Sequence, residues 1–405
     1  MRAAPLLYYL RGANMTAHAS HSGESVGAND SGQGNPPFVL PIYQSAGWVF
    51  RSLDEVDAVY EGRSPGTIYG GSGVPNHAAL EASICSLHGT QTAIVTAAGM
   101  SAFAAVLWHL THAGARIVAA TNLYGNTLRL LGDLTKFGVT IDTVDAADLE
   151  QVQAALRTPA RLLIVETISN PRLHVADLHA LATLAHERGA LIVVDNTLAS
   201  PYHCRPAEHG CDIIIESITK FLGGHHDTVS GCVTGSREII EPLRLPATRA
   251  GLISAAFDSW LAARSVATLS VRLSRSSATS LTIAQWLERQ PKVAAVHYPG
   301  LPADASYPVA RRTLRGGFGS VVSFELAPDR AAVDRLLAAL PHIKLVLSFG
   351  GVATTLAHPA TSSHRALSPE QRAALGIHDG FLRLSVGLED EADIIADLER
   401  GLAAV

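Results

Sequence analysis

The chain carries little charge and few cysteines. Charged residues make up 17% of its 405 positions, and the net charge at pH 7 is −5. Such a chain has no broad electrostatic attraction for nucleic acid or for an anionic membrane surface, so neither is expected as a partner. The four cysteines are scattered and form no CxxC pair, which argues against a zinc cluster and a disulfide framework and fits a reducing compartment.

One long segment has no charged side chain at all. Between Ala82 and Ala115 there is no Asp, Glu, Lys or Arg, which raises the question of a membrane span. Polar residues such as Gln91 and Ser101 interrupt it, so a strand followed by a buried helix explains it better than a span of about 20 apolar residues. The N-terminus lacks a lasting apolar stretch and a clear cleavage site, and Met15 is an alternative start. We expect a cytoplasmic protein without a membrane partner.

At 405 residues the chain is long enough for two or three domains and a large core, and its 47% of hydrophobic residues fits a globular protein with much buried surface. From residue 91 onward, short apolar runs alternate with stretches of helical spacing. This alternation predicts an α/β fold, a mainly parallel sheet with helices on both faces. The predicted strands are 91–97, 116–120, 139–144, 161–166, 191–194 and 213–215.

The pattern changes beyond residue 254, where a smaller α+β domain is expected. Its predicted elements are a long helical stretch 255–289, strand 320–326, helix 331–340, strands 344–348 and 381–386, and a final helix from about 390. The predicted organisation is therefore an N-terminal arm 1–66, a large domain 67–254 and a C-terminal domain 255–405.

The stretch from Ala190 to Gly235 carries the clearest chemical signal. Two apolar runs of buried-strand type are followed by Asp195 and, after a short turn, by Lys220. A carboxylate and an amine then lie at the edge of the sheet where open α/β folds bind ligands. A lysine among apolar neighbours is a candidate for a lowered pKa and for imine chemistry. With the hydroxyls of Ser217 and Thr219 for a phosphate, this set suits pyridoxal phosphate.

Each of these residues also has a simpler interpretation. A lysine after a strand usually reaches solvent, and Asp-Asn-Thr is a common turn or helix start. Gly99 and Met100, at a strand-to-helix turn, would present backbone N–H groups to an anion, or would form an ordinary tight turn. Tyr124 follows another strand, where its ring would stack on a planar cofactor and its phenol would move protons, or where it would simply pack in the core.

Two further features follow strands of the pattern. Arg383 lies within an apolar strand, where a guanidinium needs a partner, and its fork suits the α-carboxylate of an amino acid. Asn170 follows the strand predicted at 161–166. The cluster Gly224-His225-His226-Asp227 suggests a metal site, but adjacent histidines rarely converge on one ion, so no metal is expected.

From about His21 to the C-terminus, the chain resembles the Cys/Met-metabolism family of pyridoxal phosphate enzymes, the trans-sulfuration enzymes. The resemblance implies fold-type I architecture, as in aspartate aminotransferase, and a tetramer of active dimers. The matching motifs, in collinear order, include Pro41-Ile42-Tyr43-Gln44, Tyr124-Gly125-Asn126-Thr127, Glu166-Thr167-Ile168-Ser169-Asn170-Pro171, Val194-Asp195-Asn196-Thr197, Ser217-Ile218-Thr219-Lys220 and Arg383-Leu384-Ser385-Val386-Gly387.

The resemblance implies a role for each matching residue. Lys220 matches the Schiff-base lysine that later carries protons, Asp195 the partner of the pyridine nitrogen, and Tyr124 the stacking ring. Tyr69 matches a residue that reaches the phosphate of the neighbouring subunit. The implied phosphate ligands are Gly99, Met100, Ser217 and Thr219. The implied groups around the cofactor hydroxyl and substrate carboxylate are Asn170, Ser348 and Arg383.

The sequence departs from the family's pattern in several places, one of them Val74-Pro75-Asn76, where the family has Asn-Pro-Thr. Gly71 stands where the family usually has arginine, and Ala353 where many relatives have Glu or Lys on the substrate side. Arg129 resembles the arginine of cystathionine-type enzymes and would meet a distal carboxylate, although a surface ion pair is equally compatible. The implied reaction is γ-replacement or γ-elimination on an O-acylhomoserine or sulfur amino acid. Alternatives are β-elimination from cystathionine and a non-catalytic relative that binds the cofactor weakly.

Overall fold

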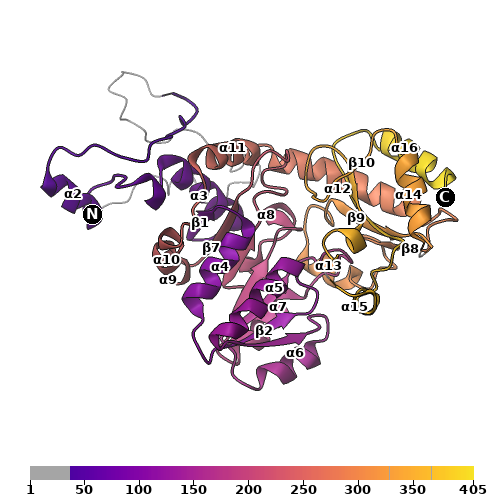
Figure 1. Ribbon diagram of the computed structural model, residues 1–405, viewed down its shortest axis with the longest axis horizontal. Coiled ribbons are helices and arrows are strands. Elements are labelled where there is room, and N and C mark those ends of the chain that lie inside the picture. Colours follow the sequence, from indigo (N-terminus) through magenta and orange to yellow (C-terminus); the bar gives the residue numbers. More distant parts are fainter. Residues whose placement is uncertain (1–36, 328, 366) are drawn as a thin grey trace.

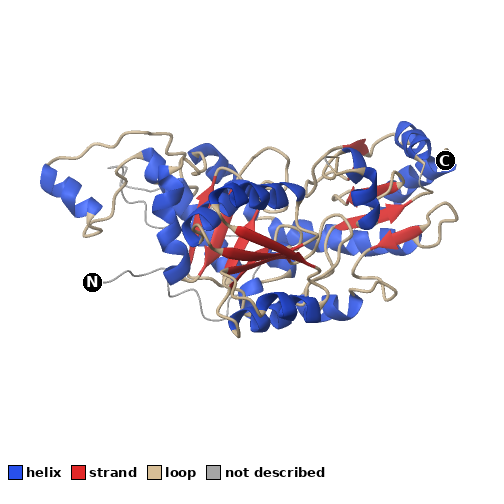
Figure 2. Ribbon diagram, turned by 60° about the horizontal axis from the view of Figure 1, so that its bottom comes forward, coloured by secondary structure: helices blue, strands red, loops and turns tan. Residues whose placement is uncertain are grey.

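The computed structural model describes residues 37–327, 329–365 and 367–405, and its strands form two sheets (Figures 1 and 2). Residues 1–36 of the expected arm, Met15 among them, lie outside the described residues. In Figure 2 the large sheet runs through the centre with helices above and below it, as the alternating pattern predicts. The α/β fold with a mainly parallel sheet is confirmed.

The large sheet has seven strands in the order β1-β7-β6-β5-β4-β2-β3. All neighbouring pairs from β6 to β3 are parallel, whereas β7 runs antiparallel to both of its neighbours. The bounds are β1 Thr92–Thr96, β2 Arg116–Ala120, β3 Thr140–Val144, β4 Leu162–Glu166, β5 Leu191–Asp195, β6 Ile213–Glu216 and β7 Gly231–Gly235.

Helices cover this sheet and lead to the second domain. Their bounds are α2 Leu53–Tyr60, α3 Pro75–His88, α4 Gly99–Leu110, α5 Gly125–Leu134, α6 Leu149–Leu156, α7 Leu178–His186, α8 Ser200–His203, α9 Arg237–Ile240, α10 Arg244–Arg249, α11 Ala256–Val266, α12 Leu269–Leu287, α13 Tyr307–Thr313, α14 Arg330–Ala339, α15 Pro369–Ala374 and α16 Glu391–Ala403. Short 3₁₀ turns are Gly70–Ser72, Thr135–Phe137, Pro206–His209, Glu241–Leu243 and Pro359–Thr361.

All six strands predicted for the large domain are present, but β7 was not predicted. It begins and ends with glycine, which the pattern assigns to loops. Both glycines are required by close packing. A Cβ at Gly231 would overlap the backbone of Ala98 and Gly99, and one at Gly235 would overlap the carbonyl of Asp212. The sheet therefore approaches the first turn of α4 at Gly231 more closely than any side chain would allow.

The smaller sheet has five strands in the order β10-β11-β12-β9-β8, and β11 and β8 were not predicted. Its bounds are β8 Ala295–His297, β9 Val321–Glu325, β10 Lys344–Leu345, β11 Thr355–Ala357 and β12 Phe381–Ser385. The helical stretch predicted over 255–289 is divided into α11 and α12, because the chain turns at Ala267 and Thr268.

Two hydrophobic cores meet along α12. Its early residues Leu269 and Leu273 pack in the core of the large sheet, and Ile283 and Leu287 pack in the core of the small one. Helix α11 packs against α3 and adds to the large core. The domain boundary at 254/255 stays a prediction, and we propose that α12 is the connection the two cores share.

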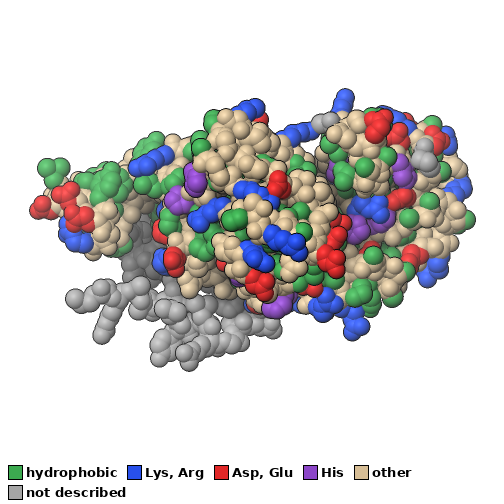
Figure 3. All heavy atoms as spheres, turned by 90° about the horizontal axis from the view of Figure 1, so that it is seen from below, with side chains coloured by type: hydrophobic (Ala, Val, Ile, Leu, Met, Phe, Trp, Pro, Cys, Tyr) green, Lys and Arg blue, Asp and Glu red, His purple; other side chains and the backbone are tan. Residues whose placement is uncertain are grey.

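Residues 37–72 extend away from the body, with α2 at the far end in Figure 1. Asn76, near the start of α3, fastens this arm, because its side-chain oxygen accepts the Tyr43 N–H at 2.8 Å and its amide donates to the Pro41 carbonyl at 2.9 Å. The large apolar side chains that are exposed on the arm are Phe38, Val39, Ile42, Val49, Leu53, Tyr60 and Tyr69. Figure 3 shows apolar side chains at the left end of the molecule, where the arm extends.

Within the described part of the chain, none of the helices combines the length and the apolar character that a membrane crossing requires.

We predict that Gly231→Ala lowers the free energy of unfolding by about 1–3 kcal/mol, because the new methyl group must displace the backbone at the start of α4. The matched control is Gly132→Ala in α5, where nothing lies within 4 Å of the added carbon. Removing a helical glycine there should raise stability by about 0.5–1 kcal/mol. Urea unfolding measures both, and equal effects of the two changes would contradict the prediction.

Candidate active site

Lys220 lies in the turn that follows β6, in contact with a segment of the C-terminal domain. Its ammonium group donates to the hydroxyl of Ser348 at 2.8 Å and lies 5.1 Å from the ring centroid of Phe349. Gly350 makes this approach possible, since a Cβ there would come within 2.9 Å of the Lys220 carbonyl carbon. Burial, followed by the charge of Arg383, lowers the pKa of Lys220 to about 8. A partly neutral amine near pH 8 suits a nucleophile or a proton carrier.

Asp195 is the last residue of β5, directly beside β6 in the sheet. One carboxylate oxygen accepts the Thr197 N–H at 3.0 Å. Burial raises the pKa of Asp195 to about 6, while the bonds from Thr197 oppose that rise. Asp195 and Lys220 therefore follow neighbouring strands, as the sequence predicts, and both have ionisation shifted by burial.

Two more carboxylates flank Asp195, and the sequence reasoning gave neither a role. Glu166 ends β4, pairs with Asp195 in the ladder, and accepts the Tyr124 N–H at 2.6 Å. Its other oxygen is buried without a hydrogen-bond partner among the described residues, and burial raises the pKa of Glu166 well above its usual value. Glu216 ends β6 on the other side. The signal was available, because each strand ends in an acidic residue.

An anion cradle forms where α4 begins. The residue before the helix, Ala98, supplies no side-chain cap, and its carbonyl accepts the Ser101 N–H at 3.0 Å, so the N–H groups of Gly99 and Met100 are those that an anion would meet. Gly99 packs against Ser217, since a Cβ at position 99 would lie 3.0 Å from the Ser217 Cβ. A side chain at position 99 would crowd Ser217, so glycine permits this close packing, and a phosphate at this helix start stays a prediction.

Thr219 and Met100 contribute to this region in other ways. The Thr219 hydroxyl is engaged with Ser230, accepting its N–H at 3.1 Å and donating to its carbonyl at 3.1 Å. The sulfur of Met100 lies 3.9 Å from the hydroxyl of Thr127 in α5. Both side chains therefore contact neighbouring segments, Thr219 at Ser230 and Met100 at Thr127. Their contact with a phosphate stays a prediction.

Arg383 brings three segments together. It lies fully buried in β12 and donates to the side-chain oxygen of Asn170 at 2.8 Å and to the carbonyl of Ser348 at 3.2 Å. Its guanidinium carbon is 4.9 Å from the ring centroid of Phe349. Burial lowers the pKa of Arg383 to about 10, so it stays charged at neutral pH. Asn170, Ser348 and Arg383, predicted as one group, are neighbours in the structure.

Tyr124 precedes α5 at the edge of this group. Its side chain is 37% exposed, and its phenol oxygen accepts the Asn126 amide at 3.1 Å. The electrostatic interaction of Tyr124 with Arg383 places the ring near the buried guanidinium. Its ring is therefore available to a planar ligand rather than packed in the core.

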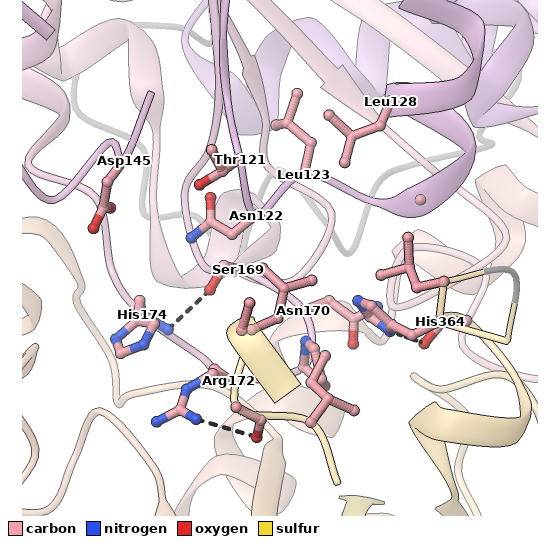
Figure 4. Close-up of a pocket in the computed structure, with 18 of the residues that line it drawn as sticks. Thr121, Asn122, Leu123, Leu128, Asp145, Ser169, Asn170, Arg172, His174 and His364 are labelled. Carbon is pink, nitrogen blue, oxygen red and sulfur yellow. Dashed lines mark hydrogen bonds between the residues drawn. The ribbon is translucent and has the colours of Figure 1, made fainter. Parts of the chain in front are cut away.

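Arg129 lies one turn further along α5 and is exposed, donating to the Asn126 side chain at 2.9 Å. It lines a cavity of about 660 Å³ that also borders Asn170 (Figure 4). In this cavity Arg172 and His174 come from the loop after β4, and His364 from the C-terminal domain, so both domains form its walls. Lys220 and Asp195 do not line this cavity. It borders the site at Asn170 and does not include the amine–carboxylate pair.

Tyr69 lies on the arm, 58% exposed, and pairs with Gly47 through an isolated bridge. Its ring lies over Gly71, where a Cβ would come within 2.7 Å of the ring. An arginine at position 71 would displace this ring, which gives a physical reason for glycine at that position.

The histidine cluster forms no metal site in the region that the structure covers, where no three His, Cys, Asp or Glu side chains converge. His225 instead faces the Gly223 carbonyl at 2.8 Å, and His226 packs against Gly351.

A lysine of lowered pKa, a carboxylate on the adjacent strand and a glycine-lined anion cradle define the class of enzymes that hold pyridoxal phosphate through a lysine. The family described as Cys/Met metabolism PLP-dependent enzymes matches residues 24–403, and the chain belongs to that family. The predicted family, the cofactor and the trans-sulfuration class of enzyme are thereby confirmed.

Curated relatives and solved structures of several activities resemble the chain. It is 37% identical over 365 residues to an O-succinylhomoserine sulfhydrylase of Pseudomonas aeruginosa, covering 90% of each chain. It is 36% identical to an L-methionine gamma-lyase of Porphyromonas gingivalis, covering 89% of this chain and 92% of that one. A cystathionine gamma synthase from Xanthomonas oryzae pv. oryzae, solved with aminoacrylate and cysteine, superposes with a TM-score of 0.90 at 33% identity, covering 97% and 98%.

We predict that the apoenzyme captures pyridoxal phosphate at a rate that rises with pH with its midpoint near pH 8, because only the neutral amine of Lys220 reacts. An ordinary lysine would have its midpoint above about pH 10. Arg383→Gln should move the midpoint upward, since it removes the neighbouring positive charge, although burial keeps it below the ordinary value. Stopped-flow absorbance measures the rate, and a midpoint that Arg383→Gln leaves in place would contradict the assignment.

Proposed function

We propose that this chain catalyses γ-replacement or γ-elimination on an O-acylhomoserine or a sulfur amino acid. The observation that carries the proposal is the double contact of Ser348. Its hydroxyl accepts the Lys220 ammonium and its carbonyl accepts the Arg383 guanidinium. A substrate whose α-carboxylate binds Arg383 then has its α-carbon beside the amine that must take its proton.

Pyridoxal phosphate, when bound, supplies an electron sink that stabilises negative charge at the substrate's α and β carbons. The chain's own groups do the rest. Arg383 and Asn170 bind and orient the α-carboxylate, and the freed amine of Lys220 takes the α-proton and then a β-proton. Asp195 would hold the proton on the pyridine nitrogen. The γ-substituent would then leave, and either a thiol would add in its place or the remaining product would be hydrolysed to a 2-oxo acid and ammonia.

The remaining roles follow from position. The first turn of α4 and Ser217 would hold the phosphate, as the close packing of Gly99 on Ser217 supports. Tyr124 would cover the ring, which its exposed side chain at the edge of the site supports. The hydrogen bond from the Tyr124 N–H to the Glu166 carboxylate holds the backbone from which that ring projects.

The distal part of the substrate is assigned to the side that faces α5. Arg129 has no carboxylate partner among the described residues, since its contact is the Asn126 amide oxygen. Ala353 is exposed and brings no charge of either sign. An acyl group that ends in a carboxylate would therefore meet a cation and no acid at these two positions. The name of the Pseudomonas aeruginosa relative, O-succinylhomoserine sulfhydrylase, supports such a substrate.

A second copy of the chain is proposed as the partner, in an active dimer that would assemble further into a tetramer. The arm exposes large apolar side chains, such as Val49 and Leu53, which a neighbouring subunit would cover. Tyr69 lies on this arm, so it is positioned to serve a neighbour's phosphate. The four cysteines are free thiols, which supports the prediction of a cytoplasmic location.

The proposed reaction is tested with a substrate panel of O-acetylhomoserine, O-succinylhomoserine, cystathionine and methionine, with products identified by mass spectrometry. We expect release of the γ-substituent, and no turnover or visible cofactor absorbance for Lys220→Ala. Arg129→Gln should raise KM for the succinyl ester about tenfold more than for the acetyl ester, because one charge-assisted hydrogen bond is lost. Pyruvate and homocysteine from cystathionine as the main products would instead establish β-elimination.

The dimer is tested by mixing two inactive variants, Lys220→Ala and Tyr69→Ala, under conditions that exchange subunits. We expect activity to return, because one site of each hybrid combines an intact Lys220 with the partner's intact Tyr69. If Tyr69 served its own subunit, every site in the hybrid would lack one of the two groups, and the mixture would stay inactive. Light scattering checks the oligomeric state of each variant.

A further inference from the structure

Arg272 is a buried cation in the first turn of α12, and the proposed reaction does not use it. The residue is 6% exposed, and burial lowers its pKa to about 10, so it stays charged at neutral pH. Its hydrogen-bond acceptors among the described residues are all neutral oxygens. A charge buried in this way is expensive, so the contacts of Arg272 must offset that penalty.

Two of these oxygens belong to the turn that carries Lys220. The Nη1 of Arg272 donates to the Phe221 carbonyl at 2.7 Å, and its Nη2 donates to the Leu222 carbonyl at 3.3 Å. Both residues are buried, and neither carbonyl has another donor among the described residues. Buried carbonyls need a partner, so Arg272 satisfies the backbone that directly follows Lys220.

The same guanidinium is held at the junction between α11 and α12. Its Nε donates to the Thr268 hydroxyl at 3.0 Å, and its Nη2 donates to the Ser265 carbonyl at 3.0 Å. The Thr268 hydroxyl in turn donates to the Ser265 carbonyl at 3.0 Å. A rigid fork of donors can serve both places at once, which the single nitrogen of a lysine cannot do. Arg272 therefore connects the helix junction to the turn after β6.

Glycines make room on both sides of this turn. Gly224 has a φ of +71°, its N–H donates to the Lys220 carbonyl at 2.7 Å, and a Cβ there would overlap the Nη1 of Arg272. On the side of the C-terminal domain, a Cβ at Gly350 would come within 2.9 Å of the Lys220 carbonyl carbon. The backbone of Lys220 is thus enclosed between α12 and the segment that carries Ser348.

We propose that Arg272 is a positioning residue for the Lys220 amine, because it holds the turn after β6 in the orientation that directs this amine toward Ser348. The proposal rests on the role assigned to Lys220 above. Without the guanidinium, the carbonyls of Phe221 and Leu222 must turn toward other donors, and the Lys220 backbone turns with them. The cofactor contacts proposed at α4 and Asp195 belong to other elements and do not depend on these carbonyls.

The test compares two ligands of the apoenzyme at about pH 9, above the pKa of Lys220, so that the amine is mostly neutral. The amine condenses with the aldehyde of pyridoxal phosphate and releases water, whereas pyridoxine phosphate carries an alcohol there and binds without reacting. Arg272→Gln should slow the capture of saturating pyridoxal phosphate by about tenfold to a hundredfold, measured by stopped-flow absorbance. Its Kd for pyridoxine phosphate should stay close to that of the wild type.

The matched control is Arg275→Gln on the same helix. Arg275 is exposed and donates to Asp390 at 2.8 Å, away from the Lys220 turn, so this change should leave both the capture rate and the Kd at their wild-type values. Thermal melting of each apoenzyme checks that the variants are folded.

Gly224→Ala keeps the proposal testable if Arg272→Gln does not fold. The added methyl group displaces the guanidinium from the turn while Arg272 itself remains, so it should also slow capture and spare the binding of pyridoxine phosphate. In the double variant the two effects should not multiply, because the second change removes a contact that the first has already broken. Effects that multiply fully would show that the two residues act independently and would overturn the proposal.

A wild-type capture rate in Arg272→Gln would also overturn it. So would a loss of pyridoxine phosphate affinity, in Arg272→Gln or Gly224→Ala, as large as the loss of capture rate, because a merely structural role weakens both ligands together. Failure of the proposed function gives a different result. If Lys220→Ala captured pyridoxal phosphate at the wild-type rate, another amine would be the reacting group, whatever the Arg272 variants do.

Discussion

The buried guanidinium of Arg383 is the constraint on which the site depends. It lies inside an apolar strand, and its partners among the described residues are neutral oxygens of Asn170 and Ser348. A cation without a counter-charge is expensive to bury, and the lowered pKa of Arg383 reflects that penalty. A carboxylate ligand would supply the missing charge. The fold keeps the guanidinium in place by packing β12 between β9 and β11, where its strand cannot shift.

The site separates charge of opposite sign. Lys220 and Arg383 lie on the side formed with the C-terminal domain, while Glu166, Asp195 and Glu216 lie along the edge of the large sheet. A ligand that fits this separation carries a cationic ring nitrogen at one end and anionic groups at the other. Pyridoxal phosphate with an amino-acid substrate has this distribution. The anion cradle at the start of α4 is the proposed site of the phosphate, and it would need no cationic side chain.

Sequence reasoning located Lys220 and Asp195 because each follows an apolar strand, so their position at the ligand edge follows from the parallel sheet. It missed β7, since glycines that a sheet needs for close approach look like loop residues. It grouped Asn170, Ser348 and Arg383 only through a family resemblance, because contacts across so many residues leave no local pattern. It also did not foresee the contact of His88 with Glu216, because that contact joins the end of α3 to the end of β6, far apart in the sequence.

The double contact of Ser348 has a consequence for the reaction. Ser348 contacts both the Lys220 amine, which we propose moves protons, and the Arg383 guanidinium, which we propose binds the substrate carboxylate. In that reaction the spacing between base and α-carbon would be set by the geometry of a single serine, and Phe349 beside it packs against both cations. Fixed spacing of this kind turns proton transfer into an intramolecular step, which is where orientation contributes most to rate. Because Lys220 belongs to the large domain and Ser348 to the small one, the packing of the two domains along α12 becomes part of the catalytic geometry.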